Sequence, residues 1–443
     1  MNSKPTPTQH LVRIEKIIAG GQGLARIVAG QVILSGFVLP GEHVELREVK
    51  RKSGFIEAEL LQIVEPSPER VSPRCPLYGD CGGCDLQHGS YAEQLRIKQA
   101  IVAEAMQRAH VPLPAVAVDD AVPSPLQWAY RYRLRLKIGP DGQLGFFRKK
   151  SNDFVTVNSC PAAADGINAT LVELSASGAL RGLLHEVELL QSPADGQITL
   201  LLPLKEKQRL STATVQTIAA CVNVSHISCM SEQSFWYVYS RSGTAEPLTQ
   251  QISLFNQNCT LSWSGGCFSQ VNPSQNVRLI ELALELAQDV QGKNVLDLYC
   301  GMGNFSVPLA LAGGEVFGVE GNRESIKWAK RNAEAARCAA RFAAADVHDR
   351  LQQMIKERQR ADIILLDPPR AGIGRTAALL PKLQADKIIY ISCDPATLAR
   401  DLRTLCGSDY AVARLIPVDM FPQTHHIETA ILLEKQRKIF IND

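Results

Sequence analysis

Apolar and polar positions divide the chain into three regions with different spacing. Between residues 10 and 65, short apolar runs alternate with glycine-rich or charged turns, and about five strands in this span predict a small OB-like β-barrel. From about residue 294, short apolar runs alternate with helical patterns, which predicts a doubly wound, mostly parallel α/β sheet. The last two apolar runs, at 411–420 and 428–435, predict an antiparallel hairpin that ends this sheet.

The region between them is mixed, and its clearest pattern is a strand with a period of two at 128–139. One face of this strand carries the apolar and aromatic residues Tyr130, Tyr132, Leu134 and Leu136. The other face carries the basic residues Arg131, Arg133, Arg135 and Lys137. A turn at 139–142 returns the chain, so the segment predicts a basic hairpin whose surface suits phosphates and unpaired bases. An ordinary half-exposed hairpin has the same pattern and stays an alternative.

The composition is that of a soluble globular protein, with 45% hydrophobic and 21% charged residues among 443. This length is enough for about three domains. The sequence shows no leading apolar segment and no uncharged run of membrane-spanning length, so we expect a cytoplasmic protein without membrane contacts. The net charge of +2 means that any affinity for nucleic acid must come from local basic patches. Nothing in the sequence indicates more than a monomer.

Twelve cysteines are too few for a disulfide scaffold in a chain of this length, which points to metal binding or catalysis. Cys75, Cys81 and Cys84 form a C-x5-C-x2-C motif, and Cys160 is the nearby candidate for a fourth ligand. Thiolate ligands with this spacing suit an iron–sulfur cluster or a structural zinc ion. The spacing alone does not decide between them.

Glycines and carboxylates follow the first two strands of the α/β region in a pattern typical of a site for a nucleoside-containing cofactor. A G-x-G pattern at 301–303 lets the backbone approach a ligand, and Glu320 closes the second strand, where a carboxylate can bind ribose hydroxyls. The third glycine of a nicotinamide site is absent, and Asp297 inside the first strand would repel a pyrophosphate. S-adenosylmethionine fits better because it has a ribose and a cationic sulfonium but no phosphate. Asp346 and Asp367, at later strand ends, would meet its adenine and its methyl group.

A single cysteine, Cys393, stands where the strand-like run 388–392 changes into a helical pattern. Pro395 suits the first position of a helix and Asp394 suits its N-cap. Backbone N–H groups at a helix N-terminus favour the nucleophilic thiolate, although the Asp394 carboxylate partly opposes this effect. A small buried hydrophobic residue is the commoner role of such a cysteine, so the position alone does not establish catalysis.

Five motifs together carry a family resemblance that favours the catalytic role. They are DLYCGMGNFSVPLA in the glycine-containing loop, FSQVNP at 268–273, LDPPRAG at 366–372, ISCDPATLARDL at 391–402 and DMFPQTHHIE at 419–428. In combination they resemble the RNA uracil-5-methyltransferase family. The N-terminal barrel resembles a TRAM domain, and the cysteine set resembles the [4Fe–4S] site of the ribosomal branch. Within the family, the pattern is most similar to the branch that acts on large-subunit (23S) ribosomal RNA.

This resemblance implies a Rossmann-like, S-adenosylmethionine-dependent catalytic domain and assigns roles to particular residues. The cofactor pocket would be lined by Gln270, Tyr299, Asn304, Glu320, Asp346 and Asp367. The nucleophile would be Cys393 and the base Glu428, while a [4Fe–4S] cluster would be held by Cys75, Cys81, Cys84 and Cys160. The implied domains are a barrel at 9–66, an iron–sulfur and RNA-binding domain at 67–89 and 126–262, and the catalytic domain at 90–125 and 263–443.

The expected reaction forms 5-methyluridine in 23S rRNA through a covalent bond between Cys393 and C6 of uracil, because C5 alone is too weak a nucleophile. Methylation at another ribosomal site or in transfer RNA is an alternative. A cytosine-5 methyltransferase is disfavoured because the DPPRAG motif stands where such enzymes have a second cysteine. An iron–sulfur RNA-binding factor without activity and an iron–sulfur oxidoreductase are the further alternatives. The cluster is expected to be structural, with a redox role left open.

Overall fold

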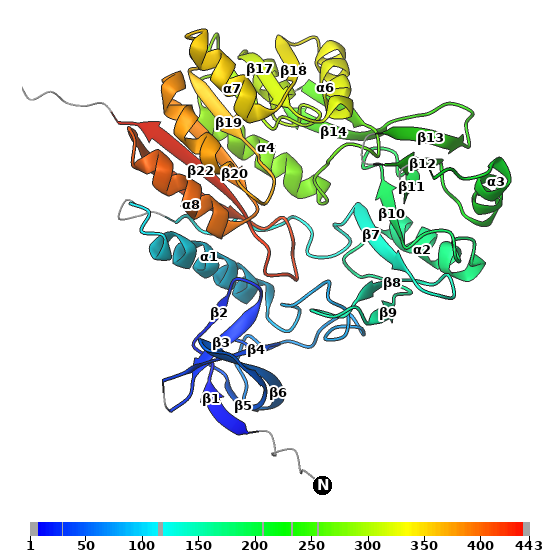
Figure 1. Cartoon of the computed structure of the whole chain (residues 1–443), viewed down its shortest axis with the longest axis vertical. Coiled ribbons are helices and arrows are strands. Elements are labelled where there is room, and N and C mark those ends of the chain that lie inside the picture. Colours follow the sequence, from blue (N-terminus) through cyan, green and yellow to red (C-terminus); the bar gives the residue numbers. More distant parts are fainter. Residues whose placement is uncertain are drawn as a thin grey trace, which may run out of the picture.

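The computed structural model describes residues 8–28, 30–113, 118–205, 208–231, 234–254 and 257–436, so the last residues of the expected catalytic domain lie outside it. Within the described residues, the strands form three large sheets and one two-stranded sheet. Figure 1 shows the three large sheets as separate bodies, with the N-terminal barrel and the central sheet both joined to the C-terminal α/β part.

The N-terminal sheet has six strands in the order β1-β5-β6-β4-β3-β2. They are β1 (Gln9–Arg13), β2 (Lys16–Ile18), β3 (Gln22–Arg26), β4 (Val32–Gly36), β5 (His43–Arg51) and β6 (Phe55–Glu65). One strand more is present than the apolar pattern predicts, because the first apolar run is divided. Its first part pairs with β5 and its second part pairs with β3, so the chain changes partners at Ile14 and Glu15. Such a corner lets a small sheet curl around its core.

The central sheet has seven strands in the order β13-β12-β11-β10-β7-β8-β9. They are β7 (Arg133–Ile138), β8 (Leu144–Phe147), β9 (Phe154–Thr156), β10 (Glu186–Gln191), β11 (Ile198–Pro203), β12 (His226–Met230) and β13 (Phe235–Ser240). Two helices cover it, α2 (Asp165–Ser177) and α3 (Thr212–Cys221). Their apolar residues and those of the sheet form one core. A separate hairpin of β14 (Leu248–Leu254) and β15 (Gln257–Trp263) follows.

The basic face predicted for the hairpin at 128–139 is largely neutralised. Strand β10 lies beside β7, and its Glu188 forms ion pairs with Arg133 and Arg135, while Glu186 pairs with Lys137 at 2.6 Å. Charges of opposite sign on neighbouring strands stabilise the sheet. Phosphate binding by this row stays a prediction, and these three cations already have carboxylate partners.

The α/β sheet has the order β18-β17-β16-β19-β20-β22-β21, in which the first five strands are parallel and β22 and β21 form the predicted antiparallel hairpin. The strands are β16 (Asn294–Leu298), β17 (Glu315–Glu320), β18 (Ala340–Ala344), β19 (Ile363–Leu366), β20 (Lys387–Ser392), β21 (Tyr410–Val418) and β22 (Glu428–Lys435). The predicted doubly wound sheet is confirmed, with its change of winding direction between β16 and β19.

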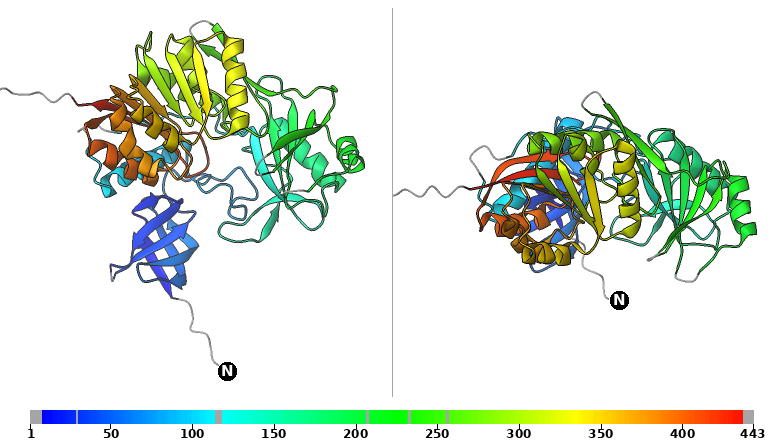
Figure 2. Two further views of the ribbon diagram at one scale, coloured as in Figure 1. Left: turned by 45° about the horizontal axis from the view of Figure 1, so that its top comes forward. Right: turned by 90° about the horizontal axis from the view of Figure 1, so that it is seen from above.

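Both faces of this sheet are buried under helices, as Figure 2 shows. One face is covered by α4 (Pro273–Ala287), α5 (Ser306–Leu311) and α6 (Arg323–Ala336). The other is covered by α7 (Val347–Lys356), the 3₁₀ helix η1 (Gly374–Leu383), α8 (Pro395–Cys406) and α1 (Tyr91–Arg108). Successive strand residues alternate between the two cores: Ile388 and Tyr390 belong to one, Ile389 and Ile391 to the other. Burial on both faces explains the continuous apolar runs in the sequence.

Helix α1 lies between the barrel and the α/β part (Figure 1). Its Ile97 and Ile101 belong to the core of the barrel, while Val102 and Met106 belong to the core under α8. Ser90 is its N-cap and accepts a hydrogen bond from the backbone N–H of Glu93. The helix therefore holds the two parts together. Among the described residues, no helix combines the length and the apolar character that crossing a membrane requires.

Candidate active site

Most of the expected site residues come together at one edge of the α/β sheet, because the carboxyl ends of parallel strands lie on the same side. Across this edge, in sheet order, stand Asp346 after β18, Glu320 at the end of β17, Tyr299 after β16, Asp367 after β19, Cys393 after β20 and Glu428 at the start of β22. Ligands of open α/β sheets bind at this edge, beside the change of winding direction. The edge thus has an expected cofactor half and an expected catalytic half.

Cys393 and Glu428 are neighbours across two strands. Ser392 of β20 is paired with Thr429 of β22, and the same register continued by one residue places Cys393 opposite Glu428. The Glu428 side chain is buried, with 4% of its residue surface exposed, and its Oε2 has no hydrogen-bond partner within the described structure. Burial and the nearby Asp367 raise the pKa of Glu428 to about 8, against the opposing effect of Arg370. A buried carboxylate with one free oxygen and a pKa near neutrality suits a general base.

The expectation that the start of a helix makes Cys393 a thiolate is wrong for the protein without ligands. Burial, Glu428 and Asp367 raise the pKa of the thiol to about 12, although Arg370 lowers it. The helix N-terminus contributes little because Asp394 occupies it: its carboxylate accepts hydrogen bonds from the N–H groups of Ala396 and Thr397, at 3.0 and 2.8 Å. Burial, together with two carboxylates nearby, outweighs the helix dipole.

Glu320 and Tyr299 form the cofactor half of the edge together with Asp346. The Glu320 carboxylate accepts hydrogen bonds from the N–H groups of Gly301 and Asn322, at 3.3 and 2.7 Å, which fixes it beside the glycine-containing loop. Tyr299 has a φ of 63°, a left-handed conformation that turns the chain sharply after β16. Burial, Asp346, Asp401 and Glu320 raise the pKa of its hydroxyl to about 12. Asp346 is the N-cap of α7.

Two further carboxylates make this edge acidic. Asp297 lies fully buried inside β16, where Ser306 donates a hydrogen bond to its Oδ2 and its Oδ1 has no partner within the described structure. Burial, with Asp367 and Glu320 nearby, raises the pKa of Asp297 to about 7, and burial alone raises that of Asp367 to about 7. A carboxyl group whose pKa is near neutral pH is more readily ionised when a cationic ligand binds beside it. This edge therefore favours a cationic ligand and disfavours an anionic one.

The remaining two expected cofactor residues lie at the side of this edge. Asn304, in the loop before α5, exchanges two hydrogen bonds with Asn276 of α4, at 2.9 and 3.0 Å. Gln270 lies before α4 and lines a small pocket with Tyr132 and Trp263. No hydrogen bond within the described residues joins Gln270 to the other expected cofactor residues. Just before it, Phe268 is 65% exposed, which is unusual for a large aromatic residue.

The four expected cluster ligands, Cys75, Cys81, Cys84 and Cys160, line a single pocket. Its other lining residues are mostly apolar, and the backbone N–H of Gly83 lies 3.4 Å from the sulfur of Cys81. Burial raises the pKa of the Cys84 thiol to about 12. Within the described residues, no three side chains of His, Cys, Asp or Glu are arranged to share one metal ion. The sulfurs are thus gathered around one cavity, but not around one point.

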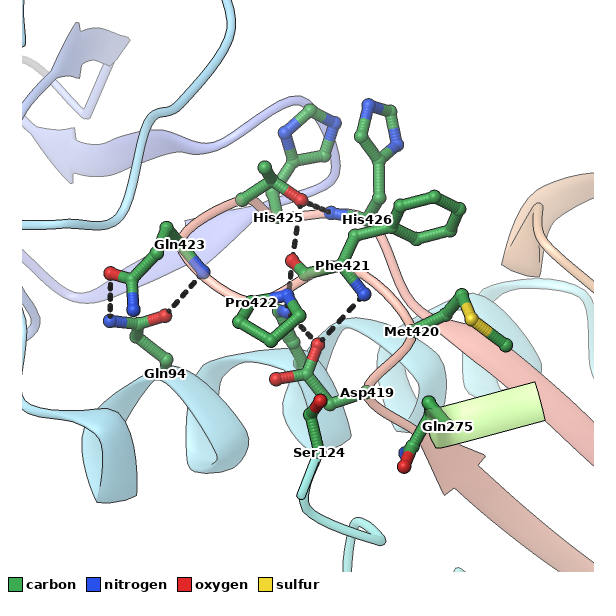
Figure 3. Close-up of polar contacts among 12 residues, drawn as sticks. Gln94, Ser124, Gln275, Asp419, Met420, Phe421, Pro422, Gln423, His425 and His426 are labelled. Carbon is green, nitrogen blue, oxygen red and sulfur yellow. Dashed lines mark hydrogen bonds and ion pairs between the residues drawn. The ribbon is translucent and has the colours of Figure 1, made fainter. Parts of the chain in front are cut away.

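The loop 419–427, which leads into Glu428, is held by segments distant in sequence (Figure 3). Gln94 of α1 exchanges two hydrogen bonds with Gln423, at 3.0 and 2.9 Å. Asp419 forms a fully buried ion pair with Lys98 of α1, and His425 bonds to Asp85, the residue after Cys84. Removing one partner of such a buried pair typically costs about 3–5 kcal/mol. The loop therefore fixes the catalytic half of the edge relative to both α1 and the cysteine pocket.

A groove that sequence reasoning missed joins the cysteine pocket to the catalytic half of the edge. Its lining combines two arginines, three phenylalanines and a histidine from four separate segments, and its volume is about 310 Å³. The lining residues are Gly82, Gly83, Arg131, Phe146, Phe147, Arg370, Phe421, Thr424 and His426. Neither arginine forms an ion pair within the described residues. The signal in the sequence was present, since Arg370 belongs to the DPPRAG motif and His426 to the FPQTHHI segment.

Comparisons with known proteins agree with this geometry. The family model described as tRNA (uracil-5-)-methyltransferase matches residues 90–436. A 23S rRNA (uracil(1939)-C(5))-methyltransferase RlmD from Cronobacter sakazakii is 34% identical, over 96% of each chain, and one from Shewanella frigidimarina is 33% identical, over 94% of this chain and 93% of the relative. The crystal structure of the Pyrococcus abyssi tRNA (uracil-54, C5)-methyltransferase in complex with S-adenosyl-L-homocysteine has a TM-score of 0.73 and 25% identity, covering 96% of this chain and all of that one. The chain therefore belongs to the tRNA (uracil-5-)-methyltransferase family.

Proposed function

We propose that this protein transfers a methyl group from S-adenosylmethionine to C5 of a uridine in 23S ribosomal RNA. The observation that carries the proposal is the placement of Cys393 opposite the buried Glu428, at an acidic sheet edge that suits a cationic methyl donor. Two near full-length relatives are named for this reaction on 23S rRNA, which supports the choice of substrate.

The two residues would divide a difficult substitution into easier steps. Cys393, as the thiolate, adds to C6 of uracil, and the electron pair moves onto C5 and O4 as an enolate. C5 then forms a bond to the donor's methyl carbon, whose bond to sulfur breaks. Glu428, as the carboxylate, removes the proton from C5, and the bond between sulfur and C6 breaks to restore the double bond. The base must therefore lie close to the nucleophile, as Glu428 does.

The proposed donor site is the cofactor half of the edge. S-adenosylmethionine supplies a methyl group on a positively charged sulfur, which Asp297 and Asp367 would favour because their buried carboxyl groups gain from a nearby cation. Glu320 would bind the ribose hydroxyls. The residues proposed to line this site are Gln270, Tyr299, Asn304, Glu320, Asp346 and Asp367.

We propose that the groove between the cysteine pocket and the catalytic edge receives the RNA strand around the target nucleotide. The target base must leave its stack to reach Cys393. Arg131 and Arg370 would contact phosphates, and Phe147, which is 37% exposed, would stack on an unpaired base. The barrel at 9–66 would add contacts to the RNA backbone.

The direct test uses RNA carrying tritium at C5 of uridine. We expect wild-type protein to release tritium from a 23S rRNA fragment only when S-adenosylmethionine is present, because the C5 proton leaves only after methyl transfer. Mapping the methylated nucleotide in 23S rRNA and in tRNA then identifies the substrate. Methylation of tRNA alone would contradict the choice of ribosomal RNA, and the absence of release from both RNAs would contradict the proposed reaction.

For the cysteine pocket, we propose a [4Fe–4S] cluster held by Cys75, Cys81, Cys84 and Cys160. Four cysteines around one cavity supply the thiolate ligands that a [4Fe–4S] cluster needs, one for each iron. When bound, the cluster would supply a cross-link between the segment of Cys75 and that of Cys160. Because Asp85 follows Cys84 and bonds to His425, the cross-link would also help to fix the position of the loop 419–427.

Cys84→Ser is expected to lower the iron and acid-labile sulfide content of protein purified without oxygen from about four per chain, and to weaken its visible absorption band. Cys221→Ser is the matched control, because Cys221 is exposed and distant in sequence from the pocket. We expect the control to keep the wild-type iron content. Zinc in place of iron in the wild type, or equal iron in both variants, would contradict the proposed cluster.

A further inference from the structure

We propose a second RNA-binding site, which takes phosphate groups of the RNA backbone, at the edge of the α/β sheet opposite to the active site. The inference rests on the proposed function and names a further contact with its substrate. A cavity of about 520 Å³ lies where β16, β17 and β18 begin, beside the end of α7. Four arginines line it, Arg341, Arg350, Arg358 and Arg360, and we call this set the arginine cradle.

No side chain of the arginine cradle forms an ion pair within the described residues, and Glu315 is the one carboxylate that lines the cavity. The carboxylates that flank the turn 358–360 in sequence are already engaged. Glu357 accepts hydrogen bonds from Gln353 and Gln359, both at 2.8 Å, and Asp362 accepts one from the N–H of Asn294 at 2.8 Å. The charge of the cradle is therefore left for a ligand.

Arg350 is held in place for such a ligand. Its guanidinium lies over the ring of Phe317 at 5.2 Å, and its Nε is buried without a hydrogen-bond partner in the described structure. Arg341 is on β18, directly beside Phe317 in the strand register, and lines the same cavity as Arg350. Stacking orders a guanidinium and leaves its outer N–H groups free to bind oxygen atoms.

An extended phosphate backbone is the ligand that fits this arrangement. The arginines come from a strand, a helix and a turn, so they are spread along the cavity rather than gathered around one point. The cavity meets the end of α7, where the helix dipole is negative and disfavours a single enclosed phosphate. The negative end of α7 explains why a cation, Arg358, follows this helix. It does not explain Arg341, which lies on β18. The carboxylate of Glu315 also lines the cavity and would repel a phosphate group bound next to it. We therefore expect several phosphate contacts spaced along the cavity.

Because the cradle and the active site are at opposite edges, only an RNA longer than the target hairpin would reach both. The test compares wild-type protein with the variant Arg341→Gln, Arg350→Gln, Arg358→Gln, Arg360→Gln on a long 23S rRNA fragment and on a short hairpin that contains the target. For the long fragment, we expect the slope of log Kd against log salt to fall by about three to four, since each of the four lost phosphate contacts removes about 0.7 to 0.9. Methylation of the short hairpin should stay unchanged.

A control variant removes the same number of exposed cations elsewhere, at Arg278, Lys327, Lys382 and Arg403. It should keep the wild-type slope on the long fragment. If the cradle variant refolds poorly because Arg350 no longer covers Phe317, the double variant Arg358→Gln, Arg360→Gln on the exposed turn tests the same point, with a fall of about one to two. A wild-type slope in the folded variants would overturn the cradle, while methylation of the hairpin would still support the proposed function.

Discussion

Replacing Cys393 with alanine is expected to abolish methylation of uridine, with a loss of at least about 10⁴-fold in turnover. Without the sulfur, nothing adds to C6, so C5 stays too weak a nucleophile to take the methyl group. The measurement is the release of tritium from C5 of a labelled 23S rRNA fragment. Binding of the RNA should change little, because the arginines and aromatic residues of the groove remain.

The same variant also tests the covalent bond. RNA with 5-fluorouridine at the target should stay attached to the wild-type protein in denaturing gels, because fluorine cannot leave C5 as a proton does. Cys393→Ala should show no attached RNA. Cys406→Ala, at the other end of α8, is the matched control and should behave as the wild type. Attached RNA in the Cys393 variant would identify a different nucleophile and disprove the assigned role.

The sequence was sufficient to predict the α/β sheet and its final hairpin because strands buried on both faces leave continuous apolar runs. It also placed Glu320, Asp367 and Cys393 at strand ends, where the chain pattern changes. It did not show that Cys393 stands opposite Glu428, since this contact depends on the pairing of β20 with β22. Strand register between segments separated by a helix and another strand cannot be read from local periodicity.

Two predictions drawn from local patterns meet the same difficulty, which is that distant segments bring carboxylates to the groups concerned. The basic row of β7 meets Glu188 and Glu186 of β10, about fifty residues later in the chain. The thiol of Cys393 is buried close to Glu428 and Asp367, and burial together with these carboxylates raises its pKa where the local helix would lower it. Local patterns predict which side chains share a face, but the electrostatic environment depends on neighbours across the sheet.

The raised pKa of Cys393 has a consequence for the order of events. A thiol with a pKa near 12 is hardly ionised at neutral pH, so the protein without ligands is a poor nucleophile. A cationic donor bound beside Asp367 would oppose the two carboxylates and favour the thiolate, as Arg370 already does. If the donor binds at this edge as proposed, its presence would help to activate the nucleophile.

Glu428→Gln is expected to stop the reaction one step later than Cys393→Ala. Methyl transfer to C5 needs only the thiolate, whereas release of the product needs a base for the C5 proton. We expect turnover to fall by about 10² to 10⁴, while a methylated RNA accumulates in covalent attachment to the protein. Denaturing gels with a labelled methyl donor measure this species directly. Glu434→Gln, near the opposite end of β22, is the control and should turn over normally.

The pH dependence of the wild type and of Glu428→Gln gives an independent check. The base works only when ionised, so the turnover of the wild type should rise as pH approaches about 8, the pKa of Glu428. Stability should change in the opposite direction. Between the usual value of 4.5 and about 8, the folded state holds a proton that the unfolded state has lost, so the free energy of unfolding falls as pH rises through this window.

Glutamine cannot ionise, so Glu428→Gln should be more stable than the wild type, and the difference in melting temperature should widen from pH 5 to pH 8 before it levels off. Glu434→Gln should show no such trend. A variant that is inactive, traps methylated RNA and yet becomes more stable relative to the wild type as pH rises would identify Glu428 as a base whose burial costs the fold stability. Equal stability at every pH, with turnover intact, would instead mark Glu428 as an ordinary buried residue and leave the removal of the C5 proton to another group.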